Sequence, residues 1–182
     1  MTKLKYPDQR SKRFVFIPFC LICQAFQARG IVRLGFSSVI NPIMDEIFDN
    51  DVNIIQMPCP ESQLGGMEEG LKRDPKSLKG YDTPEFLSLC DGLADQVVSQ
   101  IKAIIANDFE VLAILGIEFS PSCSVSLQYS NQGVFHQAGH FIEVLKRKLK
   151  KEKIDIPFLG INRRGIRSSV KRLHELLERK LI

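Results

Sequence analysis

Four short apolar segments, separated by stretches with helical periodicity, constrain the fold of this 182-residue chain more than any other feature. They lie at residues 14–18, 52–57, 111–117 and 156–161, and each is apolar along most of its length. Short, largely apolar runs are typical of parallel strands that are covered on both faces of a sheet. Pro157 places the last segment at an edge of the sheet or at the start of a strand.

Helical patterns fill the stretches between and after these segments, at residues 37–48, 84–106, 134–150 and 165–181. The clearest is 84–106, where Thr83 is a good N-cap and Pro84 suits the first helical position. Strands that alternate with helices predict a parallel sheet with crossover connections. We therefore expect an α/β, Rossmann-like fold, with a parallel sheet of about four or five strands and helices on both faces. Residues 1–182 are predicted to form one domain, with residues 1–12 as a flexible N-terminus.

Composition and charge exclude several classes of protein. An apolar fraction of 44% and a net charge of +4 are ordinary for a globular protein, and no apolar run approaches the roughly 20 residues that span a bilayer. The basic N-terminus before an apolar stretch is similar to a secretory signal, but Pro18 interrupts the stretch and no clear cleavage site follows. We expect a cytoplasmic protein. The basic clusters at 146–153 and 163–172 are interpreted as solvated helix faces, which makes nucleic-acid binding unlikely to be the function.

Three of the five cysteines follow three different predicted strands. Cys20 and Cys59 each lie two residues beyond a strand, and Cys123 follows the third strand. Because ligands of open α/β sheets bind outside the carboxyl ends of the strands, this placement favours a metal or redox site at that edge. Three unrelated buried thiols are the alternative, since free cysteine is often buried.

Three thiolates without an obvious fourth protein ligand leave one coordination position open. Structural zinc sites usually have four ligands, and soft thiolates also suit copper(I) and iron–sulfur clusters. Cys23 is either a fourth ligand or a spare thiol, and we favour the spare thiol. Cys90 lies on the apolar stripe of the helix at 84–106 and is predicted to pack in the core. His136 and His140, one helical turn apart, are a less favoured zinc pair.

Short motifs stand at these three strand ends. They are Cys20-Leu-Ile-Cys-Gln24 with Arg29-Gly30, Gln56-Met-Pro-Cys59-Pro-Glu61 with Gly65-Gly66, and Ser120-Pro-Ser-Cys123. Three further segments are Arg73, Tyr81-Asp-Thr-Pro-Glu-Phe86 and Pro157-Phe-Leu-Gly160. Together these segments resemble the TudS family of thiouracil desulfurases, and more closely a TudS-related branch of desulfidases, over nearly the whole chain. The branch often has His where this chain has Phe19, and Asn where it has Cys23.

The resemblance implies an enzyme that uses an oxygen-sensitive 4Fe–4S cluster with three cysteine ligands, which an aerobic preparation is prone to lose. It would remove sulfur, as sulfide, from a small thiocarbonyl molecule related to thiouracil. The implied cluster ligands are Cys20, Cys59 and Cys123. The implied catalytic residues are Glu61 and Ser120, with Ser122 as second choice. Gln24, Arg29 and Arg73 are the candidates for substrate binding, and residues 60–82 for a loop that covers the site.

Two other functions stay open at this point. One is a non-catalytic sensor or binding protein whose cluster or zinc only orders the loops. The other is a metal-free thiol enzyme with Cys20 or Cys123 as nucleophile, which needs an environment that lowers the pKa of that thiol. The sequence does not distinguish a monomer from a homodimer.

Overall fold

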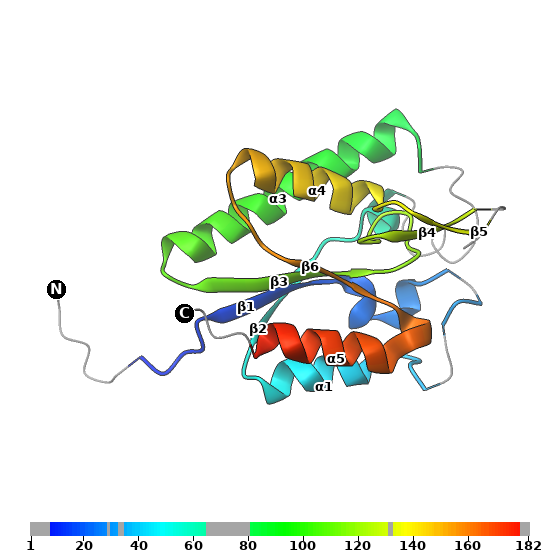
Figure 1. Cartoon of the computed structure of the whole chain (residues 1–182). Helices are drawn as coiled ribbons and strands as arrows, with labels where there is room; N and C mark the ends of the chain where they lie inside the picture. Colours follow the sequence, from blue (N-terminus) through cyan, green and yellow to red (C-terminus); the bar gives the residue numbers. More distant parts are fainter. Residues whose placement is uncertain (1–7, 29, 33–34, 65–80, 131–132, 179–182) are drawn as a thin grey trace.

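The central element of the fold is a four-stranded parallel sheet with the strand order β2-β1-β3-β6 (Figure 1). The computed structural model describes residues 8–28, 30–32, 35–64, 81–130 and 133–178. The strands are β1 (Arg13–Pro18), β2 (Asn53–Met57), β3 (Glu110–Ile117) and β6 (Phe158–Ile161). They coincide to within two residues with the four apolar segments of the sequence. The predicted α/β fold with a parallel sheet is therefore confirmed, and Pro157 directly precedes an edge strand as expected.

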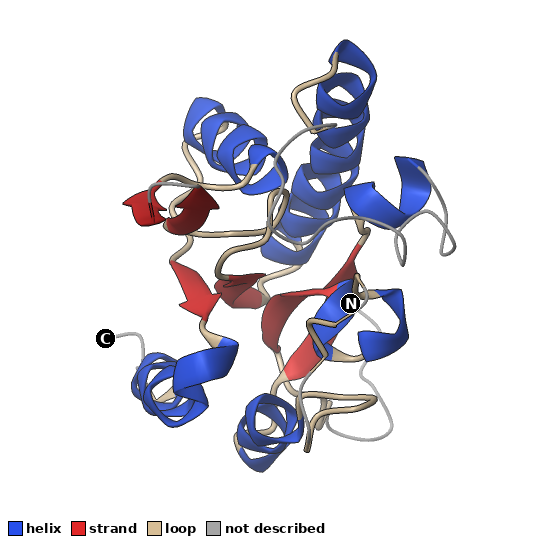
Figure 2. Ribbon diagram, turned by 90° about the vertical axis from the view of Figure 1, so that its right-hand side faces the viewer, coloured by secondary structure: helices blue, strands red, loops and turns tan. Residues whose placement is uncertain are grey.

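Helices cover both faces of the sheet, as Figures 1 and 2 show. The helices α3 (Pro84–Ala106) and α4 (His140–Lys151) pack together on one face, whereas α1 (Asn41–Asp49) and α5 (Ile166–Leu177) pack together on the other. Alternate residues of β1 feed the two cores, because side chains along a strand point to opposite faces. Phe16 lies in the core under α3 and α4, and its neighbours Val15 and Ile17 lie in the core over α1 and α5.

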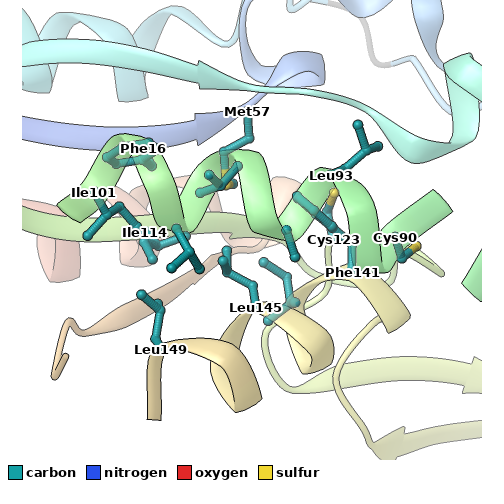
Figure 3. Close-up of a cluster of buried hydrophobic side chains, with 14 of the residues drawn as sticks. Phe16, Met57, Cys90, Leu93, Ile101, Ile114, Cys123, Phe141, Leu145 and Leu149 are labelled. Carbon is teal, nitrogen blue, oxygen red and sulfur yellow. The ribbon is translucent and has the colours of Figure 1, made fainter. Parts of the chain in front are cut away.

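The long helix α3 carries the apolar stripe that its sequence predicts. The hydroxyl of Thr83 accepts a hydrogen bond from the amide of Phe86 (3.2 Å) and so caps the first turn. Cys90 is fully buried on this stripe, which confirms its predicted place in the core. In Figure 3, Cys90 and Cys123 lie at one end of the cluster under α3 and Ile101 at the other.

The predicted helix at 134–150 is wrong in its first part. Residues 133–136 form the strand β5 (Gly133–His136), which pairs antiparallel with β4 (Leu127–Ser130), and α4 starts only at His140. Gly139 lies inside the predicted helical pattern and packs against the backbone of Ser122. A Cβ at this position would lie 2.4 Å from the backbone carbon of Ser122. His136 and His140 consequently belong to different elements and are not one helical turn apart.

The other helix boundaries shift by a few residues. α1 begins at Asn41 rather than residue 37, with Pro42 in its first turn. The helix predicted at 165–181 is α5, preceded by a 3-10 turn at Arg163–Gly165, and the residues after 178 lie outside the described range. None of the described helices combines the length and hydrophobicity needed to cross a bilayer.

Candidate functional site

A pocket at the carboxyl ends of the strands contains the three cysteines that the sequence singles out. Cys20 lies in the 3-10 turn Phe19–Leu21 after β1, Cys59 lies two residues after β2, and Cys123 lies in the turn after β3. All three line this one pocket. The connections from β1 and β3 leave the sheet toward opposite sides, because β2 and β6 flank that central pair. Such a switch point opens a crevice between the two strand ends.

The first turn is held from behind by Gln24. This side chain is 1% exposed, its amide nitrogen donates to the carbonyl of Cys20, and its backbone amide donates to the carbonyl of Ser38 (2.8 Å). Gln24 is not among the residues that line the pocket. These contacts make Gln24 a support for Cys20, and they give no support to its predicted contact with substrate.

The turn that carries Cys123 is fixed by the first amides of α4. The amide of His140 donates to the carbonyl of Pro121 (3.0 Å), and the amides of Phe141 and Ile142 donate to the carbonyl of Ser122 (3.1 and 3.2 Å). Amides in the first turn of a helix lack partners within the helix, so these loop carbonyls satisfy them. Gly139 permits this close approach, and its extended backbone (φ −72°, ψ 153°) makes it the N-cap at which the helix begins.

A buried carboxylate that the sequence analysis did not identify holds the other end of the same turn. Glu118, one residue beyond β3, is 5% exposed. It accepts hydrogen bonds from the hydroxyl of Ser124 (2.8 Å), from the amide and hydroxyl of Ser126 (3.2 and 2.9 Å) and from the amide of Leu127 (2.9 Å). A carboxylate with four donors is a stable anchor in a buried position. Glu118 therefore fixes residues 124–127, which directly follow Ser120, Ser122 and Cys123.

Glu61 and the two serines of the Ser-Pro-Ser-Cys motif form a hydrogen-bonded cluster on the pocket wall. Oε1 of Glu61 accepts from the hydroxyls of Ser122 (2.5 Å) and Ser120 (3.1 Å), and Oε2 accepts from the hydroxyl of Tyr81 (3.4 Å). The hydroxyl of Ser120 also accepts from the amide of Cys123 (3.0 Å). Ser122 is fully buried, whereas Ser120 is partly exposed in the pocket. A carboxylate thus lies beside the cysteines, oriented by three hydroxyls.

The thiols of the pocket have raised pKa values. Burial raises the pKa of Cys20 to about 12, with a further increase from Cys59, although the positive charge of Arg163 opposes it. Burial, and then the proximity of Cys59 and Cys20, holds the pKa of Cys123 well above its usual range. Burial and the carboxylate of Glu61 also raise the pKa of Cys59. Three thiols whose ionisation is disfavoured by burial and by neighbouring negative groups are suited to bind a cation together, since the positive charge reverses this effect.

The metal donors of the pocket are three thiols from three different turns. Soft thiolates suit zinc, copper(I) and iron–sulfur clusters, and iron–sulfur clusters are held by cysteine thiolates. The three cysteines therefore fit such a cluster by their chemistry. Among the described residues, no group of three or more His, Cys, Asp or Glu side chains was found that could hold a metal ion.

Several lining residues were given no role by the sequence analysis. Arg163, in the 3-10 turn before α5, lies in the pocket with Gln128, and also with Tyr81 from one of the quoted segments. Phe119 has a φ of +70° and stacks on Tyr129, with ring centroids 4.2 Å apart. A bulky residue rarely adopts a positive φ, and such strain clusters at functional sites. Phe19 and Phe26, with centroids 4.6 Å apart, provide a second aromatic pair on the pocket wall.

The structure does not place the remaining sequence candidates in the pocket. Cys23 does not line the pocket, which gives no support to its use as a fourth ligand. Arg29 and Arg73 lie outside the described residues, as do residues 65–80 of the predicted covering loop. At the end of that loop, the imidazole of His140 lies 2.8 Å from the carboxylate of Asp82.

Comparison with known proteins gives one curated relative and one solved structure. No family model matches the chain. An uncharacterised protein of Methanocaldococcus jannaschii is 24% identical over 169 residues, which are 93% of this chain and 99% of the relative. The structure of the [4Fe-4S]-dependent thiouracil desulfidase TudS matches with a TM-score of 0.47 and 18% identity, covering 88% of this chain and 97% of TudS.

Proposed function

We propose that the chain is a desulfidase that depends on a 4Fe–4S cluster bound by Cys20, Cys59 and Cys123, and that it removes sulfur from a small thiocarbonyl molecule. The observation that carries the proposal is one pocket in which three cysteines lie beside Glu61 and its two serines. The type of reaction is inferred from the motif resemblance. The pocket contains the thiols, the carboxylate and the hydroxyls that such a reaction requires.

The overall reaction is a hydrolysis without a change of oxidation state. Water supplies the oxygen of the product carbonyl, the carbon–sulfur bond breaks, and the sulfur leaves with the two protons of water as hydrogen sulfide. When bound, the cluster supplies an iron without a protein ligand, and such an iron is a soft Lewis acid for the departing sulfur. The chain's own residues have to position the ring, activate water and move protons.

Glu61 is the residue that transfers protons in the proposed reaction. Its carboxylate accepts a proton from water as the oxygen attacks the thiocarbonyl carbon, and it then returns that proton to the leaving sulfur. The second proton of water leaves the new hydroxyl as the product carbonyl forms, and it completes the hydrogen sulfide. The hydrogen bonds from Ser120 and Ser122 hold Oε1 and so fix the direction of the carboxylate. Ser120 is the more accessible of the two, and its single hydroxyl hydrogen can turn from Glu61 toward the oxygen that develops on the reacting carbon while Ser122 keeps its bond to Oε1.

The aromatic residues of the pocket favour a flat substrate. The Phe119–Tyr129 stack and the Phe19–Phe26 pair provide apolar, planar surfaces against which a heterocycle packs well. Arg163 brings a positive charge into the same pocket. We also place the reaction in the cytoplasm, where thiols stay reduced. Arg29 and Arg73 stay predictions for substrate binding.

The test is turnover of 2-thiouracil and 4-thiouracil by protein that has been purified and reconstituted without oxygen. We expect loss of the thione absorbance, formation of uracil and release of one sulfide per uracil. A reconstituted protein that binds iron and labile sulfide but releases no sulfide from either compound would favour a non-catalytic cluster-binding protein instead.

A further inference from the structure

Gln128 presents a buried amide oxygen that the fold does not use. The residue lies on β4, is 2% exposed and lines the pocket. Its amide nitrogen donates to the carbonyl of Ser120 (2.7 Å). A backbone carbonyl only accepts, so this bond fixes which end of the amide is nitrogen. Within the described part of the chain, no group donates to the remaining atom, Oε1.

Buried amide oxygens nearly always accept a hydrogen bond, and an exception calls for an explanation. The pocket offers one, because Phe119 and Tyr129, which stack on each other, line the same pocket as Gln128, and Tyr129 is its neighbour in the sequence. The pocket therefore combines a surface for a ring with an acceptor for a donor on the edge of that ring.

We propose that Gln128 is a specificity-determining residue whose Oε1 accepts a hydrogen bond from a ring N–H of the bound molecule. This inference rests on the proposed function and narrows its substrate class. The preferred substrates are thiolactams, in which the ring nitrogen next to the thiocarbonyl carries hydrogen. Ring N-alkylated thioamides are rejected, since they leave the acceptor without a partner.

The connection to Ser120 gives this contact a second consequence. Gln128 holds the carbonyl of Ser120 through Nε2, while the Ser120 hydroxyl holds Glu61. A ring that donates to Oε1 of Gln128 is therefore held close to Ser120 and Glu61, the residues proposed to act on it. Gln128 is a binding residue in this scheme, and it takes no part in proton transfer.

The experiment measures binding of uracil and of 1,3-dimethyluracil to the full-length chain prepared without oxygen. Neither probe contains a thiocarbonyl, so binding is measured without turnover. We expect the wild type to prefer uracil. Gln128→Met, which keeps the length of the side chain but has no amide, reduces this preference by roughly tenfold. Gln137→Met, on an exposed glutamine outside the pocket, leaves the preference unchanged.

A second variant separates recognition from support of the Ser120 turn. Gln128→Glu keeps an acceptor oxygen at the same length, but its carboxylate has no hydrogen to donate to the Ser120 carbonyl. The bond to Ser120 is therefore lost while the preference for uracil persists. Equal loss of preference in Gln128→Met and Gln128→Glu, a wild type that binds both probes alike, or no binding of uracil at all would each overturn the inference.

The same samples separate the two proposals. If 4-thiouracil yields no sulfide but the preference for uracil depends on Gln128, the desulfidase function fails and the recognition stands. If 4-thiouracil is converted but Gln128→Met keeps the preference for uracil, the recognition fails and the desulfidase function stands.

Discussion

The hydroxyl of Ser122 donates a hydrogen bond of 2.5 Å to Oε1 of Glu61, across 61 positions in the sequence. The bond joins the turn after β3 to the segment after β2, and Ser120 donates to the same oxygen. One carboxylate oxygen that receives two hydroxyl donors is held in a defined direction. This relationship connects the cysteine turns to the residue that we propose moves protons.

The substitution Glu61→Gln tests that proposed role. It keeps the size of the side chain and removes the base, so we expect turnover of thiouracil to fall by about 10²- to 10⁴-fold. Iron content and cluster absorbance should match those of the wild type, because Glu61 is not among the proposed ligands. The assay compares sulfide release per cluster. A variant with unimpaired turnover would remove Glu61 from the mechanism.

The thiols of the metal-free protein should react slowly at neutral pH. Burial raises the pKa of Cys20 to about 12 and the pKa of Cys123 well above its usual range, so few thiolates form below pH 9. We expect iodoacetamide labelling of both residues, followed by peptide mass spectrometry, to increase up to and beyond pH 9. Labelling of either cysteine that is already maximal at pH 7 would favour the metal-free thiol enzyme.

Glu118→Ala should destabilise the fold, because it leaves the donors of Ser124, Ser126 and Leu127 without their carboxylate. We expect a loss of roughly 3 kcal/mol in the free energy of unfolding, measured with urea. Glu118→Gln should cost less than half as much, since its amide still pairs with part of this set. Glu175→Ala, at an exposed site on α5 with a loose ion pair to Lys171, is the matched control and should be nearly neutral. Equal effects of Glu118→Ala and Glu175→Ala would contradict the anchoring role.

His174 should make the packing of α5 on α1 depend on pH. A hydrogen bond with Glu46, and then the charge of Glu178, raises the pKa of His174 above its ordinary 6.5. The folded state therefore binds the proton more tightly than the unfolded state. This stabilisation is fully present below pH 6.5 and is lost as the pH rises through the raised pKa. His174→Gln should lower the melting temperature more at pH 5.5 than at pH 8.5, and a difference independent of pH would count against the interaction.

The sheet was predictable from the sequence because its strands are buried on both faces. Continuous apolar runs such as Val111–Ile117 are typical of such strands. The hairpin β4–β5 was not predicted, because its two strands have only four residues each. The residues of β5 also continue the apolar periodicity of the helix α4 that follows. Gly133 and Gly139 were the available signals, since glycine within a helical pattern often marks a boundary.

The site was predictable where its chemistry depends on residue type at a strand end. The three cysteines and Glu61 stand in short motifs beside prolines, and the turns bring them to one pocket. Arg163, Gln128 and Tyr129 could not be identified in this way, since each comes from a segment without a distinctive local pattern. Glu118 was missed for a related reason, because a single acidic residue after a strand does not reveal that it is buried.

The most direct test of the central claim is the metal content of protein produced and reconstituted without oxygen. The account predicts a brown protein with about four irons and four labile sulfides per chain, and loss of that cluster in Cys59→Ser. Cys23→Ser, which changes a cysteine outside the pocket, should keep the full iron content. A colourless protein that binds one zinc per chain, or a cluster that survives Cys59→Ser and disappears in Cys23→Ser, would contradict it.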